Sequence, residues 1–427
     1  MSKEIFSYVK LKDIAEVEIS GVDKKIQDNE IEVSLCNFVD VYYNWAITER
    51  KAGSFMKATA KQSEIDRFAL KKGQVAITKD SETKYDIGVA TYIADDFDNV
   101  ILGYHCALIT PNECKLSGKY LNAFFHTKFV QKYFELNATG SGQRFTLSLD
   151  AIKDMPIYLP SLSKQKEIAE IFSKIDRKIE LNEAINDNLE QQIRLLYEYW
   201  FVQFNFPDTK GNPYRLSGGK MQWNDDLKTL TPEEWHCKQI IEVASIDNES
   251  LNPSNFGTQL MEHYSIPAFD ETHCPRFECA NTIESNKYVV KNKAILVSKL
   301  NPQFKRIWDP FCETQNAICS TEFISYVPHK EEIRSFLYAV LDSDAFYIHS
   351  VQRATSSTGS RKRIQPEVSA SFKFAYPDDE SIIDAFCDLC TPILKKKKDL
   401  LKENQDLRAL KDWLLPFIMN GQFSISD

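Results

Sequence analysis

The sequence predicts a protein that is built twice, with two globular halves of strands and short helices, each followed by one long helix. The order of features in the first half recurs in the second half, which indicates a duplicated unit. Two long stretches also carry an unbroken heptad rhythm, which predicts paired helices. The length of 427 residues fits this plan, because it exceeds one ordinary domain and lets each half bury its own core.

Matching segments mark the duplication. Leu11–Val17 (LKDIAEV) reappears as Cys237–Val243 (CKQIIEV), and the strand-like Gly73–Lys79 reappears as Lys293–Lys299. A short amphipathic helix is predicted at Lys119–Thr127 and again at Ser335–Ser343. A Gly/Ser-rich loop followed by an arginine, a strand and a proline occurs at Thr139–Pro160 and again at Ser356–Pro377. Chance similarity rarely preserves such an order, so we interpret the two halves as copies of one unit.

The first long helix is expected to begin after Pro160, with Ser161 and Ser163 as candidate N-caps. Apolar and amide residues step alternately by three and four along it, at Ile168, Phe172, Ile175, Ile179, Asn182, Asn186, Leu189, Ile193, Leu196 and Trp200. The second helix keeps the rhythm at Phe386, Leu389, Ile393, Lys396, Leu400, Glu403, Leu407, Leu410, Leu414 and Phe417. Polar residues in a seam fix register and partner, which favours pairing of these helices with each other. The alternative is that each helix packs only on its own half.

Composition limits the class of protein. With 43% hydrophobic and 12% aromatic residues and 14 glycines, the chain is neither collagen-like nor largely disordered. No apolar run approaches the roughly 18 residues that span a bilayer, and no signal peptide is recognisable, so we expect a cytoplasmic protein. The net charge of −9 argues against indiscriminate binding to nucleic acid but leaves room for a local basic surface.

The ten cysteines are spread along the chain, which predicts reduced core residues rather than a disulfide framework. Cys387 and Cys390 form a CxxC, and His273–Cys274 stands near Cys279. Neither group has a second pair at zinc-finger spacing, so no metal site is predicted.

Motifs for catalysis are missing. The sequence has no Walker loop, GxSxG elbow, HExxH or strand-linked GxGxxG, so no catalytic residue is predicted. Asn301–Phe304 (NPQF) resembles the Asn-Pro-x-aromatic loop with which adenine N6-methyltransferases hold a flipped base. A methyltransferase would also need a glycine-rich loop for adenosylmethionine, which this chain lacks.

Polar, aromatic and basic residues cluster where a base-reading surface would need them. The clusters are Tyr42–Trp45 and Lys79–Tyr85 in the first half, and Lys299–Arg306 and Arg361–Arg363 in the second. Arg and Lys read guanine edges, Asn and Gln read adenine, and cations in loops hold phosphates. Any one of these segments is equally well a solvated loop, but together, in duplicate positions, they predict a DNA surface.

The chain resembles the specificity (S) subunits of type I restriction-modification systems. Leu159–Pro207, followed by Tyr214–Met221 (YRLSGGKM) and Thr231–Trp235 (TPEEW), is similar to their central conserved region. Asn404–Phe423 is similar to their distal conserved region. The resemblance covers nearly the whole chain and explains both the duplication and the missing catalytic motifs.

This resemblance implies an α+β fold with two duplicated target-recognition domains joined by two long antiparallel coiled-coil helices. The implied boundaries are residues 1–160 for the first domain, 161–206 for the central helix, 207–377 for a connector and the second domain, and 378–427 for the distal helix. Each domain would read one half of a bipartite site in double-stranded DNA, while the helices set the unread spacer.

The resemblance also implies partners. The helices would dock two methyltransferase (M) subunits that bind adenosylmethionine, and the complex would recruit two restriction (R) subunits that use ATP and Mg. The chain itself would bind no cofactor and would not be an enzyme. Its acidic balance suggests that the M subunits supply part of the phosphate contacts.

Roles are carried over by position. The first domain would contact DNA through Tyr42, Tyr43, Asn44, Lys79, Lys84, Tyr85, Gln143 and Arg144. The second would use Lys299, Asn301, Gln303, Lys305, Arg306, Arg361 and Arg363. Candidates for M-subunit docking are Lys164, Lys166, Arg177, Lys395 and Lys397, for which a solvated helix face is the alternative. Two other classes of function stay open at this point: a self-contained adenine N6-methyltransferase that uses Asn301–Phe304, and a coiled-coil scaffold without a DNA role.

Overall fold

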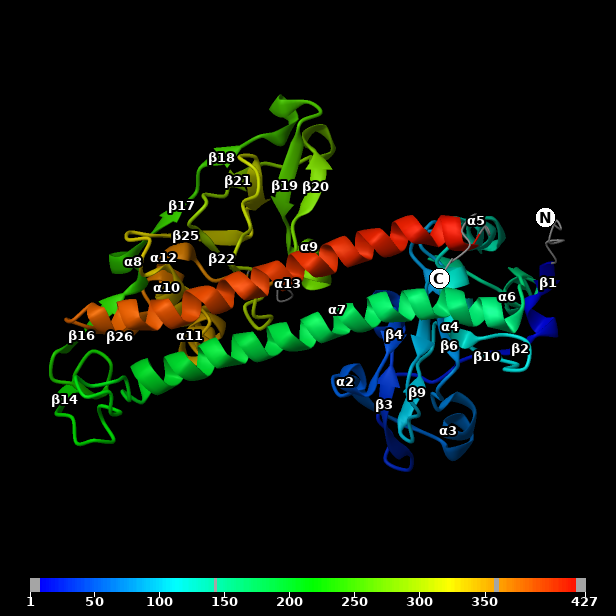
Figure 1. Cartoon of the computed structure of the whole chain (residues 1–427), viewed down its shortest axis with the longest axis horizontal. Helices are drawn as coiled ribbons and strands as arrows, with labels where there is room; N and C mark the ends of the chain where they lie inside the picture. The colour runs from blue at the N-terminus through cyan, green and yellow to red at the C-terminus, as the bar shows by residue number, and fades with distance from the viewer. Residues whose placement is uncertain (1–7, 142–143, 357–360, 420–427) are drawn as a thin grey trace. The chain divides into compact units, whose positions relative to one another are not determined.

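The computed structural model describes residues 8–141, 144–356 and 361–419. Two compact units make up the chain: unit 1 is Met1–Ile179 with Leu407–Asp427, and unit 2 is Glu180–Asp406. The two long helices, α7 (Leu162–Tyr197) and α13 (Ser381–Met419), each contribute one part to each unit (Figure 1). Among the described residues, no helix has the length and apolar character needed to cross a membrane.

Unit 1 is built on a five-stranded sheet in the order β2-β10-β6-β8-β4. Its strands are β2 (Ala15–Ile19), β4 (Ala46–Ile47), β6 (Val75–Thr78), β8 (Ala90–Ile93) and β10 (Cys106–Pro111). A three-stranded sheet has the order β5-β3-β9, with β3 (Ile31–Cys36), β5 (Met56–Ala60) and β9 (Val100–Leu102). In two smaller sheets, β1 (Tyr8–Lys10) pairs with β13 (Pro156–Tyr158), and β12 (Arg144–Thr146) lies between β7 (Asp80–Ser81) and β11 (Thr139–Ser141).

The central strands of unit 1 are buried on both faces, which is why they read as continuous apolar runs. Along β6, Val75 and Ile77 face one core while Ala76 faces another. The first core also takes in Phe172 of α7 and Leu415 of α13. Both long helices therefore stabilise unit 1 through its main core.

Short helices complete unit 1. They are η1 (Leu11–Asp13), α1 (Phe38–Tyr43), α2 (Glu49–Ala52), α3 (Gln62–Phe68), α4 (Gly118–Phe125), α5 (Lys128–Asn137) and α6 (Leu149–Lys153). The α4 helix packs on β6 and β8. Thr127 caps α5 by accepting a hydrogen bond from the Val130 N–H, and Ser148 caps α6 in the same way.

A buried lysine joins α13 to the domain of unit 1. Lys411 is buried, and its ammonium lies 3.8 Å from the centroid of the Trp45 ring. Trp45 in turn stacks on His126, with the ring centroids 4.3 Å apart. Burial lowers the pKa of Lys411 to about 8, and the positive charge of Arg408 acts in the same direction. The aromatic face compensates part of the desolvation of the ammonium.

Unit 2 contains a four-stranded sheet in the order β17-β25-β22-β23. Its strands are β17 (Ala244–Asp247), β22 (Ile295–Ser298), β23 (Ile307–Trp308) and β25 (Phe323–Pro328). A five-stranded sheet has the order β18-β21-β24-β19-β20, with β18 (Ser250–Leu251), β19 (Leu260–Tyr264), β20 (Arg276–Cys279), β21 (Lys287–Val289) and β24 (Ala317–Ser320). Two smaller pairs are β16 (Trp235–Gln239) with β26 (Lys373–Pro377), and β14 (Met221–Asn224) with β15 (Thr229–Pro232).

The helices of unit 2 are short apart from the two long ones. They are η2 (Glu198–Val202), α8 (Ile240–Val243), η3 (Pro253–Phe256), α9 (Ile266–Thr272), η4 (Ala280–Thr282), α10 (Arg334–Leu341), α11 (Asp344–Arg353) and α12 (Pro366–Ala370). Aromatic rings dominate the main core, where Phe201 contacts both Phe336 and Phe386. The cysteines of the CxxC, Cys387 and Cys390, are buried in this core.

The order of elements in unit 1 recurs in unit 2. The strands β2, β6 and β10 correspond to β17, β22 and β25, because each trio has the same neighbours and hydrogen-bond register. The helix pair α4 and α5 corresponds to α10 and α11. One predicted match has the wrong register: the Leu11 N–H donates to Met155 O, and it is the Ile240 N–H that donates to the equivalent Phe372 O. Leu11 therefore corresponds to Ile240 and not to Cys237.

Within unit 2, α7 and α13 run side by side and antiparallel. Asn182 Nδ2 donates to Glu403 Oε2 at 2.8 Å and to Asn404 Oδ1 at 2.9 Å, and Lys397 Nζ donates to Glu190 Oε2 at 2.9 Å. Higher residue numbers on α7 thus meet lower numbers on α13.

The buried stripe of α7 passes through the predicted positions, since Ile168, Phe172, Ile179, Asn182, Asn186 and Ile193 are buried and Ile175, Leu189 and Leu196 are half-buried. On α13, Leu400 is buried and Leu407 and Leu414 are half-buried, but Leu410 is 42% exposed. The buried side chains Asn404, Lys411 and Leu415 follow the predicted Glu403, Leu410 and Leu414 by one residue each. The prediction from apolar residues therefore places the buried stripe of α13 one residue too early at these positions. Two of the buried side chains that it misses, Asn404 and Lys411, are polar.

Candidate nucleic-acid interface

In unit 1, the pairing of β6 with β10 brings polar residues from distant parts of the sequence to one end of the sheet. Thr78 lies opposite Cys106, so Lys79 and Asp80, which follow β6, meet His105, which precedes β10. The β7–β12 pairing places Thr146 opposite Asp80 and brings Arg144 to the same end. We call Lys79, Asp80, His105 and Arg144 the Asp80 cluster.

Asp80 is the centre of this cluster. Its carboxylate accepts a hydrogen bond from Lys79 Nζ at 3.0 Å and contacts the His105 ring nitrogen Nδ1, while Arg144 Nη2 lies 3.5 Å away. Lys79 Nζ also donates to Thr146 Oγ1 at 3.0 Å. Burial raises the pKa of Asp80, but the hydrogen bonds from Thr146, His105 and Lys79 outweigh it and lower the pKa to about 2.

The two cations of the cluster differ in accessibility. The Lys79 side chain is 18% exposed, whereas that of Arg144 is 61% exposed. Lys79 therefore helps to hold the cluster together, and Arg144 presents its guanidinium to solvent. An exposed guanidinium that is oriented by a fixed carboxylate suits recognition of a phosphate or a guanine edge.

The shifted Asp80 makes the stability of the protein depend on pH. Because its folded-state pKa lies below the unfolded value, its contribution is present above about pH 4 and is lost as the pH falls towards 2. At pH 6, Asp80→Asn should lower the free energy of unfolding by on the order of 1 to 2 kcal/mol. Urea denaturation of both proteins between pH 6 and 3 should show the difference shrinking at the acid end. A difference that is constant across this range would contradict the assignment.

The aromatic residues predicted in the first domain lie in different surroundings. The Tyr42 hydroxyl donates to Asp86 Oδ2 at 2.6 Å, and Asn44 Nδ2 donates to Asp40 O at 2.8 Å at the end of α1. Tyr43 and Tyr85 are exposed, and Lys84 Nζ lies 5.1 Å from the Tyr85 ring centroid. Gln143 lies outside the described residues.

Unit 2 repeats this arrangement with different side chains. Ser298 lies opposite Phe323, so Lys299, which follows β22, meets Glu322, which precedes β25. Arg363 donates hydrogen bonds to Glu322 from two nitrogens: Nε lies 3.0 Å from Oε2, and Nη2 lies 2.8 Å from Oε1. These hydrogen bonds lower the pKa of Glu322, and the charges of Lys299 and Arg361 add to the effect. We call Lys299, Glu322, Arg361 and Arg363 the Glu322 cluster.

The predicted loop after β22 is folded against this cluster. Asn301 has a left-handed backbone with φ of 49°. Its N–H donates to Lys362 O at 2.7 Å, and the Lys362 N–H donates to Asn301 Oδ1 at 2.9 Å. The Asn301 side chain therefore holds the loop to segment 361–363, and the two segments form one surface.

Two predicted contact residues of this loop are engaged by carboxylates inside unit 2. Lys305 Nζ lies 2.7 Å from Asp342 Oδ1, and Arg306 binds both oxygens of Asp270 at 2.6 and 2.8 Å. Both side chains are largely buried. Gln303 and Arg361 are exposed.

Sequence reasoning missed His105 and Glu322 and did not select Asp80. His105 and Glu322 occupy the same place, because the Lys79 N–H donates to His105 O and the Lys299 N–H donates to Glu322 O. A repeat alignment that extended through the strands β10 and β25 would have paired them.

The residues predicted to dock M subunits also differ from one another. Lys166, Arg177 and Lys395 are exposed, and Lys164 pairs with Glu167 at 3.1 Å. Lys397 is only 12% exposed and pairs with Glu190 inside unit 2, so it is not available as an exposed docking residue. Across the described ranges, no group of three or more His, Cys, Asp and Glu residues is placed to hold a metal ion.

Comparison with known proteins first gives the class. Residues 4–191 match the family model of the type I restriction modification DNA specificity domain. Relatives then define the group more closely. The chain is 27% identical over 173 residues to the Type I restriction enzyme HindI specificity subunit of Haemophilus influenzae, a match that covers 39% of this chain and 37% of that protein. It is 22% identical over 327 residues to the MjaIX specificity subunit of Methanocaldococcus jannaschii, which covers 75% and 72%.

A solved structure shows the same fold. The chain superposes on the crystal structure of a type I restriction-modification S subunit from M. genitalium with a TM-score of 0.52 at 14% identity, covering 100% of this chain and 99% of that one. The predicted resemblance to type I specificity subunits is confirmed by the family model over residues 4–191 and by these two relatives.

Proposed function

We propose that this chain is the DNA sequence-specificity subunit of a type I restriction-modification complex, in which the domains at residues 1–160 and 207–377 each read one half of a bipartite site. One observation carries the proposal: exposed arginines occupy the same place in both units. Arg144 precedes Leu147, whose N–H donates to Lys79 O at 2.9 Å. Arg361 precedes Ile364 by the same interval, and the Ile364 N–H donates to Lys299 O at 3.1 Å.

Local charge supports DNA binding despite the acidic chain. In each cluster a carboxylate binds an arginine at one end of a sheet. Asp80 lies 3.5 Å from the exposed Arg144, and Glu322 accepts hydrogen bonds from Arg363 near the exposed Arg361. A guanidinium that a carboxylate already orients, as in Arg144 and Arg363, loses little conformational entropy when it binds a base edge or a phosphate. The cations of Lys305 and Arg306 serve instead to shape the second domain.

The long helices are proposed to set the unread spacer. The 36 residues of α7 correspond to about 54 Å at 1.5 Å per residue. The buried Asn182 fixes the register of its pairing with α13, because a slip would separate its amide from Glu403 and Asn404.

An apolar stripe on α7 is the surface that we assign to M-subunit docking. The stripe consists of the exposed Leu181 and Ile185, four residues apart, and, ten residues further on, the exposed Leu195, Tyr199 and Val202, which step by four and three. Tyr199 and Val202 lie in η2, which continues α7. The spacing of the stripe places its residues on one helix face, beside the face that α13 covers. Exposed apolar residues gathered on one helix face are typical of a protein interface. The chain supplies no catalytic group in this proposal, and methyl transfer from adenosylmethionine belongs to the M subunit.

Ile185→Lys should therefore abolish copurification with an M subunit, because a charge would be desolvated in the interface. The isolated variant should keep its unfolding midpoint, since Ile185 is exposed. Asp187→Lys, at an exposed position on another face of the same helix, is the control and should retain the M subunit. Retention of the M subunit by the Ile185 variant would move the docking surface elsewhere.

The proposal as a whole is tested by coexpressing the chain with an M subunit from a type I system and mapping N6-methyladenine across the host genome. We expect a bipartite methylated motif that appears only when both proteins are present. Methylation by the chain alone would favour the adenine methyltransferase alternative. Absence of any motif with a partner that copurifies would contradict the specificity function.

A further inference from the structure

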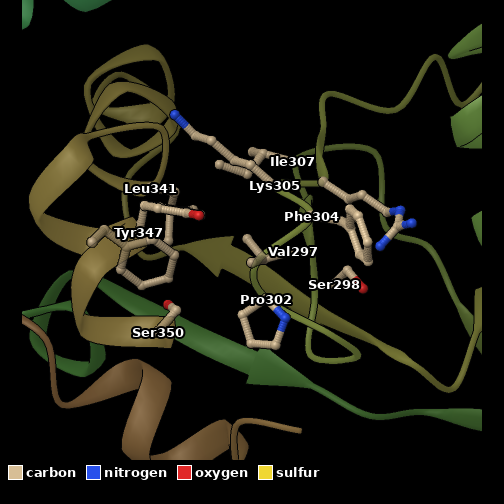
Figure 2. Close-up of a pocket in the computed structure, with 11 residues that line it drawn as sticks. Val297, Ser298, Pro302, Phe304, Lys305, Ile307, Leu341, Tyr347 and Ser350 are labelled. Carbon is tan, nitrogen blue, oxygen red and sulfur yellow. The ribbon is translucent and has the colours of Figure 1, made fainter. Parts of the chain in front are cut away.

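A small cavity opens in unit 2 between the loop that follows β22 and helices α10 and α11 (Figure 2). Most of its wall is apolar, with Val297, Pro302, Ile307 and Leu341 among the lining residues, and the cations Lys305 and Arg306 line it as well. Its volume of about 20 Å³ is room for one group of the size of a water molecule or a methyl group. Ser350 lines the cavity as well.

The duplicated fold shows why the cavity exists. Phe134 in α5 and Ser350 in α11 occupy corresponding positions, since each follows the capping residue of its helix, Thr127 or Ser343, by seven residues. In unit 1 the Phe134 ring fills the space: a Cβ built on Gly88 would lie 2.2 Å from this ring. The phenyl group is therefore packed directly on the glycine backbone.

The bulky and small residues are exchanged in unit 2. The Thr78 N–H donates to Val89 O and the Ser298 N–H donates to Arg306 O, so the residue that corresponds to Gly88 is Lys305. Lys305 extends away from Ser350 (Figure 2) and binds Asp342. Neither side chain fills the space that the phenyl ring occupies in unit 1.

Ser350 has an unpaired hydroxyl in this cavity. The residue is 6% exposed, and in the described part of the chain its Oγ has no hydrogen-bond partner. A buried hydroxyl without a partner is unfavourable and is uncommon in folded proteins. The cavity therefore combines apolar walls with a hydrogen-bonding group that is still available.

The cavity adjoins the Glu322 cluster. Pro302 and Phe304 belong to the loop that Asn301 fastens to Lys362. Phe304 is 57% exposed beside the cavity, and the Arg306 guanidinium lies 5.2 Å from its ring centroid. A group that enters the cavity would thus come from a molecule lying next to the cations of the cluster.

We propose that this cavity reads the edge of a thymine in the half-site bound by the second domain. Thymine is the base that presents a methyl group in the major groove, and its O4 acceptor lies directly beside that methyl. The methyl group would occupy the cavity, and the Ser350 hydroxyl would donate to O4. This inference rests on the proposed DNA-reading function and assigns Ser350 as a specificity residue.

The test uses the complex of this chain with M subunits and duplexes that carry its mapped site. Each thymine of the second half-site is replaced in turn by uracil, which lacks the methyl group and keeps O4. One replacement should weaken binding about fourfold, the value of one buried methyl group, and the others should have no effect. Fluorescence anisotropy measures the affinities.

Variants identify the cavity as the cause. In Ser350→Phe the ring should fill the space as Phe134 does in unit 1, so that the thymine and uracil duplexes bind equally. Ser350→Ala keeps the cavity and should keep the uracil effect while binding every duplex more weakly. The exposed Ser254→Phe is the control and should behave as the wild type.

The outcomes separate this inference from the proposed function. A bipartite motif whose second half shows no uracil effect at any position, or contains no thymine on either strand, overturns the thymine assignment alone. An effect that persists in a folded Ser350→Phe complex also overturns it, and the scan of the wild type decides the question if that variant does not fold. Absence of any methylated motif removes both proposals.

Discussion

Replacing residues 1–160 with the corresponding domain of a related specificity subunit is expected to change one half of the methylated motif completely and to leave the other half unchanged. The Asp80 cluster lies wholly within residues 1–160, and the Glu322 cluster lies wholly within residues 207–377. The hybrid therefore loses the whole Asp80 cluster and keeps the whole Glu322 cluster. Genome-wide mapping of N6-methyladenine in cells that express the hybrid with its M subunit reads out both halves at once.

The reciprocal exchange of residues 207–377 is the matched control. It should change the half of the motif that the first hybrid keeps. A simultaneous change in both halves, in either hybrid, would show that one domain does not read one half-site. A hybrid that copurifies with the M subunit and still produces the original motif would place the recognition residues outside the two clusters.

Lys397→Met is expected to lower the free energy of unfolding by about 2 to 3 kcal/mol. Lys397 Nζ donates to Glu190 at 2.9 Å and lies 3.3 Å from the Tyr338 hydroxyl, and its side chain is 12% exposed. The substitution would leave the carboxylate of Glu190 with the more distant Arg194, whose Nη2 lies 3.8 Å from Oε1. Breaking a fully buried pair costs about 3 to 5 kcal/mol, and the partial exposure of Glu190 reduces this value. Urea denaturation measures the difference.

Lys395→Met provides the control two residues earlier on the same helix. Lys395 is exposed, so its substitution should change the free energy of unfolding by less than about 0.5 kcal/mol. The double variant Lys397→Met with Glu190→Gln should recover part of the loss, because the carboxylate that has lost its closer cation is removed as well. Equal effects of Lys395→Met and Lys397→Met would contradict the role of the ion pair.

Elements with strong local patterns were predictable from the sequence. The strand-like Gly73–Lys79 contains β6, and Lys119–Thr127 contains most of α4. Each of these two segments is continuously apolar or amphipathic. The pattern of its own residues is therefore enough to predict its secondary structure. The predicted correspondence of Leu11 with Cys237 was wrong because similar residues recur a few positions further along the sequence. Only the backbone hydrogen bonds show that Ile240 is the equivalent residue.

The candidate site was harder to predict for a physical reason. Whether a cation is exposed depends on carboxylates that are distant in the sequence, such as Asp270 for Arg306 and Asp342 for Lys305. A single sequence shows the cations but not these partners. The buried stripe of α13 shows the same limit, because Asn404 and Lys411 are buried through contacts with other segments.

The packing of Lys411 against Trp45 has a consequence for the exchange of the first domain. A new first domain that enters the gene by exchange near its start meets a C-terminal helix encoded at the far end, which the exchange leaves in place. An incoming domain without an aromatic residue at position 45 would leave the buried ammonium without its compensating ring. A first domain exchanged into this chain must therefore match a helix that it does not encode, which narrows the set of domains that the chain can accept without losing stability.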